Sequence, residues 1–129
     1  MISDADLIAA VTAYKVALRS ASHDAAAIAY DDEKYEPYSF SSDAQEAIVK
    51  DVEAFIKDQY DNLELFMEIT GDDWSGVGHN FALTRCGQPG FGIRGAAGLA
   101  VDTIIESCFT FGRMYPYLND DTDEIDVEV

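Results

Sequence analysis

The residue types best suited to catalysis occur close together in residues 72–86. His79 follows Asp72 and Asp73 by a few positions. A histidine near carboxylates can act as a general base or bind a metal ion. A histidine here can also hold the start of a strand through a hydrogen bond, and we favour this structural role.

Cys86 is a second candidate, because a neighbouring cation such as Arg85 can lower the pKa of a thiol. The nearest histidine is His79, seven positions earlier on the same predicted strand. We therefore expect no catalytic Cys–His pair. Cys108 lies on the apolar side of a predicted helix and is expected in the core.

Two further segments have compositions that can bind ions. Residues 87–95, GQPGFGIRG, are rich in glycine but lack the Gly-Lys-Ser/Thr ending of a P-loop and the spacing of a dinucleotide fingerprint. Residues 119–124, NDDTDE, lack the glycine and the distal glutamate of an EF-hand loop, so a hairpin turn is the better interpretation. We predict no catalytic residue, no metal and no cofactor.

Composition narrows the classes of function. The chain has 129 residues, a formal net charge of −17 and 48% apolar residues, which predicts one globular domain over residues 1–129. This charge argues against direct binding to nucleic acid or to an anionic membrane. The acidic start differs from a signal peptide, and no apolar run approaches the roughly 20 residues that span a bilayer. We expect a soluble cytoplasmic protein.

The negative charge is concentrated in two segments. Residues 24–68 carry thirteen acids against three lysines, and residues 114–129 carry six acids and no base. Residues 71–113 carry four acids against three arginines and are nearly neutral. Two acidic surfaces are therefore expected on either side of a neutral centre.

Two helices are predicted in the first seventy residues, which contain no glycine. The first begins at Ser3, which forms a capping box with Asp6, and ends near residues 20–22. Its apolar face is Leu7, Ile8, Val11, Tyr14 and Leu18. The second runs from an N-cap at Ser41 or Ser42 to Thr70-Gly71, with a break near Asp61-Asn62. Residues 23–41 between them suit either a helical turn or an ordered loop.

The second half predicts strands and one more helix. Phe81 and Leu83 alternate with smaller or polar residues over residues 79–85, which predicts a strand. A turn is predicted at residues 86–90 and a second, antiparallel strand at residues 91–94, so the segment indicates a hairpin. A helix follows over residues 96–109. Residues 114–129 indicate a second hairpin, in which Pro116 favours an edge position. The predicted fold is α+β in the order α-α-β-β-α-β-β, with helices packed on one face of a small antiparallel sheet.

Residues 78–92, GHNFALTRCGQPGFG, resemble the motif GHDFWLTRNGHGAGFW of a family of small acidic proteins from bacteriophages and prophages. The resemblance covers about residues 38–128, including the helix around residues 51–55 and the acidic C-terminal hairpin. This chain departs from the motif at Asn80, Ala82, Cys86 and Gln88, where the family favours Asp, Trp, Asn and His. These departures favour a structural hairpin over an active site. The family has no settled biochemical role, so the resemblance implies a phage origin rather than a mechanism.

Acids of the second helix fall mainly on its polar side, about 5–6 Å apart, which is similar to the spacing of phosphates along a nucleic-acid strand. Such a stripe on a rigid helix can imitate DNA. We therefore expect an inhibitor of a basic, nucleic-acid-binding host protein, of the anti-restriction or anti-CRISPR type. The expected partner-binding residues are Asp43, Glu46, Glu53, Asp61, Glu64, Glu68, Asp120, Asp121, Asp123, Glu124, Tyr35 and Tyr38.

Three other interpretations stay open, and one of them is a small enzyme that uses His79, Cys86 or Arg85. The charge can serve solubility alone in a non-enzymatic accessory or structural phage protein that forms a homodimer through tyrosines and apolar surface. The excess of Asp over Glu and the scarcity of Lys also suit adaptation to high salt.

Overall fold

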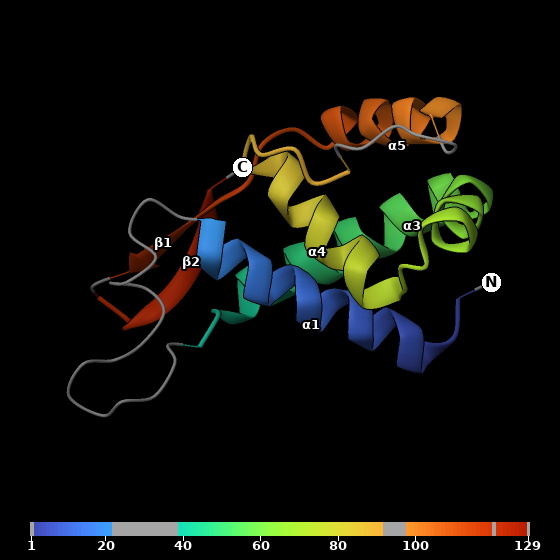
Figure 1. Cartoon of the computed structure of the whole chain (residues 1–129). Coiled ribbons are helices and arrows are strands. Elements are labelled where there is room, and N and C mark those ends of the chain that lie inside the picture. Colours follow the sequence, from blue (N-terminus) through green and yellow to red (C-terminus); the bar gives the residue numbers. More distant parts are fainter. Residues whose placement is uncertain (1, 22–38, 92–97, 120, 129) are drawn as a thin grey trace.

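The computed structural model describes residues 2–21, 39–91, 98–119 and 121–128. These residues form four helices and one two-stranded antiparallel sheet, so the predicted α+β class is confirmed. Figure 1 shows α4 lying between α1 and α5, with the sheet at one end of the molecule. The elements are α1 (Asp4–Ala21), α3 (Ser42–Thr70), α4 (Trp74–Arg85), α5 (Gly98–Thr110), β1 (Tyr115–Asn119) and β2 (Glu124–Glu128).

Helix α1 begins as the sequence predicts. The Ser3 hydroxyl accepts a hydrogen bond from the backbone N–H of Asp6 at 3.1 Å. The buried face includes Ala10, Val11, Tyr14, Ala17 and Leu18. Ile8 was expected on this face and is 65% exposed instead. It lies about 120° around the helix from Tyr14, at 100° per residue, and so misses the buried stripe.

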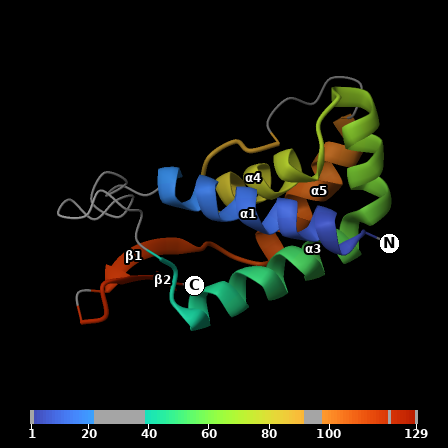
Figure 2. The same cartoon turned by 90° about the horizontal axis from the view of Figure 1, so that it is seen from below.

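Helix α3 has both predicted caps. The Ser41 hydroxyl accepts from the Ala44 N–H at 3.1 Å, and Gly71 ends the helix with a φ of 77°. The break lies at Gln59, two residues before the expected position. At this point the buried Gln59 side chain donates to the Asp58 carboxylate and accepts from the Asn62 amide, each at 3.0 Å. Figure 2 shows that the two parts of α3 run in different directions.

The predicted hairpin over residues 79–94 is wrong. Residues 74–85 form helix α4, which Asp73 caps by accepting from the Gly76 N–H at 2.9 Å. The buried positions include Val77, Phe81 and Arg85, which follow a spacing of four. The turn at residues 86–90 is confirmed, and the expected return strand lies almost entirely outside the described residues.

Close packing against α1 explains why this segment is helical. A Cβ atom on Gly78 would lie only 2.0 Å from the backbone oxygen of Ala10, so the two helix backbones are nearly in contact. The rings of Phe81 and Phe55 stack at 4.1 Å beneath this crossing. A helix places Gly78 and Phe81 on one face, whereas a strand would place them on opposite faces.

The last helix and the last hairpin are confirmed. Helix α5 buries Val101, Ile104 and Cys108. In the hairpin Tyr115 pairs with Glu128, and Asn119 pairs with Glu124. The other edge of β2 is held by residues 39–41, since the Ser41 N–H donates to Ile125 O at 2.9 Å. The hairpin is thereby fixed to the start of α3.

Candidate functional site

Exposed acids form one cluster on the part of α3 after the break. We call residues 60–70 the distal arm. Its acids Asp61, Glu64 and Glu68 are all exposed. Residues 58–73 contain six acids and no lysine or arginine. The distal arm is therefore uniformly negative in charge.

The part of α3 before the break is different. Glu46 and Glu53 are exposed, but Lys50 and Lys57 follow them by four residues and are also exposed. Residues four apart lie on one face of a helix, so each acid has a lysine beside it. The stripe is therefore not uniform, because lysines interrupt its first half and the break at Gln59 changes the direction of its second half. Its imitation of DNA stays a prediction.

The other acids gather at the sheet. Asp121 and Asp123 are exposed in the hairpin turn and Glu124 is half-buried. Asp43, predicted as part of the α3 stripe, instead lines a shallow pocket of about 320 Å³ with Asp126 and the half-exposed Tyr117. Three predicted partner-binding residues, Tyr35, Tyr38 and Asp120, lie outside the described residues.

The carboxylate of Asp126 in β2 stabilises the fold through two hydrogen bonds. The Ser41 hydroxyl donates to the Asp126 carboxylate, and the Asn119 amide donates to it at 2.9 Å. These two hydrogen bonds lower the pKa of Asp126. Figure 1 places the hairpin and the distal arm at opposite ends of the molecule, so the predicted acids form two separate surfaces.

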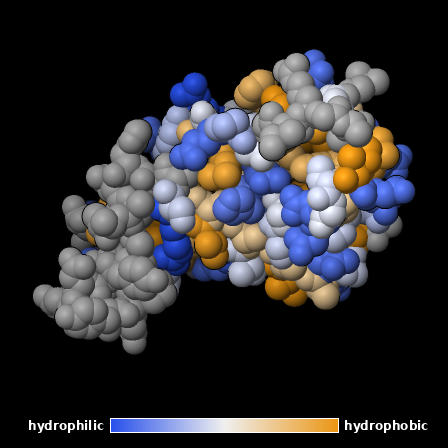
Figure 3. Space-filling model, viewed as in Figure 1, coloured by the Kyte–Doolittle hydropathy of each residue, from blue (hydrophilic) through white to orange (hydrophobic). Residues whose placement is uncertain are grey.

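The distal arm also exposes aliphatic side chains. Leu65 is 44% exposed and Ile69 is 42% exposed, one helical turn apart. They lie beside Glu64 and Glu68 in the sequence. The sequence contains a signal for this pair, because neither residue belongs to the apolar series that recurs at helical spacing along the second helix: Ile48, Val49, Val52, Phe55, Ile56, Tyr60, Leu63, Phe66 and Met67. On the face shown in Figure 3, hydrophobic and hydrophilic side chains are likewise interspersed.

An aromatic pair lies at the base of the distal arm. Tyr60 and Trp74 are half-buried, and their rings stack at 5.6 Å with an angle of 25° between them. Partial burial, and then the carboxylates of Glu64, Asp6 and Asp61, raise the pKa of Tyr60. The pair links the distal arm to the start of α4.

The candidate catalytic groups around His79 have structural tasks. His79 is exposed on α4, not at the start of a strand as we expected. Asp73 caps the helix, and Asp72 accepts from the Asn80 amide at 3.4 Å. Within the described ranges, no three His, Cys, Asp or Glu side chains form a group that could hold a metal ion.

Cys86 lies in an environment that opposes activation. Its thiol donates to the backbone oxygen of Met114 at 3.2 Å. Burial raises the pKa of the Cys86 thiol, and the lowering effect of Arg85 is smaller. The thiol is therefore protonated at neutral pH, whereas a nucleophilic cysteine needs the thiolate.

Arg85, which lies within residues 78–92, is buried and makes contacts with several elements. Its guanidinium donates to Asp51 at 2.8 Å, to Gly112 O at 3.0 Å and to Phe111 O at 2.9 Å. It also lies 5.5 Å from the centre of the Phe81 ring. These contacts join α4 to α3 and to the segment before the hairpin, so this part of the motif builds the core.

The glycine-rich turn after α4 offers no phosphate cradle over its described part. The N–H groups of Gly87, Gln88 and Gly90 all donate to backbone oxygens within the turn and the end of α4. A phosphate cradle needs such N–H groups free to point at the ligand.

Comparison with known proteins leaves the family assignment open. The chain matches no protein-family model, no curated protein and no solved structure. The phage-family resemblance of residues 78–92 therefore stays a prediction. None of the described helices combines the length and the apolar character needed to cross a membrane.

Proposed function

We propose that this chain is a phage-derived, non-enzymatic protein that binds a basic, nucleic-acid-binding protein in the host cytoplasm and blocks its site. Restriction enzymes and CRISPR complexes are the expected classes of target. The observation that supports this most is the distal arm, where exposed acids, in a segment (residues 58–73) that contains no lysine or arginine, lie beside exposed aliphatic side chains.

The position of the arm's acids supports a role beyond helix stability. The carbonyl end of a helix carries partial negative charge, so acids there destabilise it by about 0.3–1 kcal/mol each. Glu68 lies in the last turn of α3, and that turn contains no basic residue. A sequence selected only for a stable helix would place lysine there.

The aliphatic pair indicates how the partner is contacted. Charge complementarity speeds encounter and selects basic partners, while buried apolar side chains hold the complex together. Leu65 and Ile69 are exposed apolar side chains that can be buried in this way by a partner. We therefore propose competition for a basic surface that includes an apolar patch, rather than imitation of a long DNA stripe.

The alternative function is that of a homodimeric accessory protein. Ile8 is 65% exposed and Val16 is 57% exposed, both on α1. Burial of such side chains against a second copy would favour a dimer, with the negative charge serving solubility.

A pull-down with matched variants tests the proposal. One variant carries Asp61→Asn, Glu64→Gln and Glu68→Gln. The comparison variant carries Asp121→Asn, Asp123→Asn and Glu124→Gln in the hairpin, which holds the other expected partner-binding acids on a separate surface. The proposal places the contact on the distal arm alone. Each changes the net charge from −17 to −14, so they differ only in location.

Tagged proteins are incubated with host lysate at low and at high salt, and bound proteins are identified by mass spectrometry. We expect the wild type and the hairpin variant to retain one nucleic-acid-binding protein that salt or added DNA releases, and the arm variant to lose it. Equal retention by both variants would contradict the role of the distal arm. Recovery of the chain alone, with a dimer in sedimentation, would favour the accessory role.

A further inference from the structure

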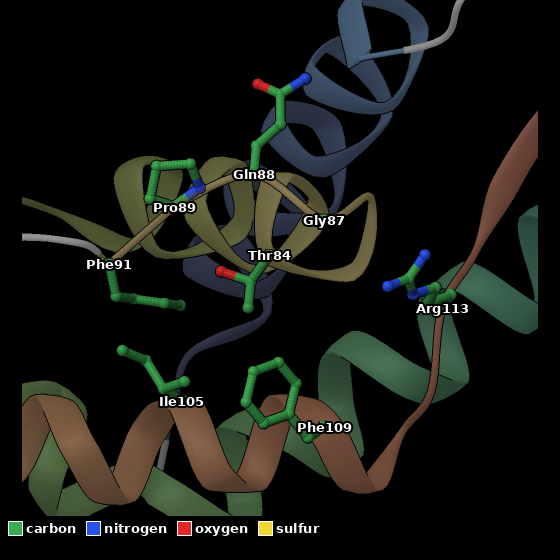
Figure 4. A pocket seen from close by; sticks show the side chains of 9 residues that line it. Thr84, Gly87, Gln88, Pro89, Phe91, Ile105, Phe109 and Arg113 are labelled. Atoms are coloured by element: carbon green, nitrogen blue, oxygen red, sulfur yellow. The ribbon is translucent and has the colours of Figure 1, made fainter.

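A groove lies between the turn after α4 and the face of α5 that points toward this turn (Figure 4). Its volume is about 480 Å³, which is within the usual range of small-molecule sites. Phe91 and Ile105 form one part of the wall, and Phe109 projects toward the turn from the last part of α5. A smaller cavity of about 220 Å³ adjoins it and shares Thr84, Gly87, Phe109 and Arg113 with it.

Part of the groove's wall is apolar and aromatic, whereas Thr84, Gln88 and Arg113 contribute polar groups. Phe91 is buried and Ile105 is half-buried, whereas Phe109 is 69% exposed, the most exposed of the large apolar side chains described. A phenyl ring this exposed offers a face on which a flat ring can stack, a contact worth about 0.5–1.5 kcal/mol beyond the area that it buries. The groove is therefore suited to a flat aromatic body.

The charge of this region differs from that of the rest of the chain. Among the described residues that line the two cavities there is no Asp or Glu, although the whole chain has 25. Their charged members are Arg85 and Arg113. The buried Arg85 is occupied by its contacts with Asp51 and the backbone.

Arg113 is a cation that a ligand can reach from the described wall of the groove. It is exposed, and in Figure 4 its guanidinium points toward the turn and the groove. One of its terminal nitrogens, Nη1, donates to the Tyr115 hydroxyl at 3.0 Å, which holds the group in place. A guanidinium offers a planar fork of donors, and a carboxylate is the group that fits this fork with two parallel hydrogen bonds.

We propose that this groove binds a small aromatic carboxylate, with the ring stacked on Phe109 and the carboxylate paired with Arg113. The proposal does not depend on the protein partner of the distal arm, which lies on a different helix. Three observations together select this ligand class: the volume of the groove, the exposed ring of Phe109, and a cation in a wall whose described residues include no acid.

The probe is 2-naphthoate, titrated into isotope-labelled protein and followed by the backbone amide signals of Gln88, Phe109 and Arg113. The uncharged control ligand is 2-naphthamide, which has the same rings. We expect saturable shifts confined to the groove, and binding of the amide weaker by about tenfold or more, because a hydrogen-bonded ion pair is lost. Equal binding of acid and amide, or no saturable shift at the groove, would overturn the proposal.

Variants separate this site from general attraction between charges. Arg113→Gln should weaken 2-naphthoate binding about tenfold, whereas Lys57→Gln on α3 makes the same change in net charge and should leave it unaltered. Phe109→Leu should also weaken binding, and this exposed side chain can be shortened without loss of the fold, which the same spectra verify. Equal effects of Arg113→Gln and Lys57→Gln would overturn the proposal. So would a wild-type dimer in sedimentation that Phe109→Leu converts to a monomer, since a second copy would then occupy the groove.

Discussion

Nη1 of Arg85 lies 2.8 Å from a carboxylate oxygen of Asp51, and the arginine side chain is fully buried while the aspartate side chain is 24% exposed. The pair joins α4 to the middle of α3. A buried charge needs both an opposite charge and hydrogen bonds for all its donors. Here the backbone oxygens of Phe111 and Gly112 take two of the remaining donors. The guanidinium of Arg85 therefore also holds the segment after α5 in place.

Asp51→Asn should lower the free energy of unfolding by about 2–3 kcal/mol, because it leaves the buried guanidinium without its counter-ion. Chemical denaturation of the two proteins measures this difference. Asp61→Asn, at an exposed position on the same helix, is the control and should change stability by less than about 0.5 kcal/mol. Similar stabilities for the two variants would show that Arg85 does not need the negative charge of Asp51.

Gly78→Ala should destabilise the protein by about 1–3 kcal/mol, because the added Cβ would meet the Ala10 backbone at 2.0 Å and force α1 and α4 apart. Thermal unfolding compares it with His79→Ala, a change at the next, exposed position. An unchanged melting temperature in Gly78→Ala would refute the close crossing of the two helices.

Glu68→Lys should separate stability from binding. The new cation lies at the negative end of α3, so the free energy of unfolding should rise by about 0.3–1 kcal/mol. The same change reverses a charge on the distal arm and should reduce capture of the proposed basic partner. Denaturation and the pull-down measure the two effects. Unchanged capture would place the binding surface elsewhere.

Asp126 should contribute stability that disappears in acid. Its folded-state pKa is lowered by the hydrogen bonds from Ser41 and Asn119, so the folded state favours the carboxylate. The contribution is therefore present above the unfolded pKa of about 4 and is lost as the pH falls through the lower, folded pKa. The stability difference between the wild type and Asp126→Asn should shrink as the pH is lowered from about 6 to about 3. A constant difference across this range would contradict the assigned hydrogen bonds.

Neither cysteine should behave as an activated thiol. Burial raises the pKa of Cys86, and it raises that of Cys108 to about 12. Alkylation by iodoacetamide near neutral pH should be slow at both sites in the folded protein and fast in urea. Fast labelling of Cys86 in the folded protein would support the enzyme interpretation.

The sequence by itself determined the elements that carry strong local signals. Ser3 and Ser41 predicted two helix starts, Gly71 predicted a helix end, and the alternation after Met114 predicted the C-terminal hairpin. Each signal acts through a hydrogen bond or a period within a few residues, so neighbouring residues suffice to specify it. The sequence also showed directly that α3 and the C-terminal hairpin are rich in acidic residues.

Tertiary structure decided the elements and surfaces that depend on distant residues. Residues 79–85 are too short for the alternation of Phe81 and Leu83 to distinguish a strand from a helix, and the contact of Gly78 with α1 makes them helical. The break at Gln59 moved the acids of α3 onto separate surfaces. Arg85 gained its counter-ion from a residue 34 positions away. Hydrogen bonds to near neighbours select local structure, but burial needs a partner surface, and the chain supplies that surface only when it folds.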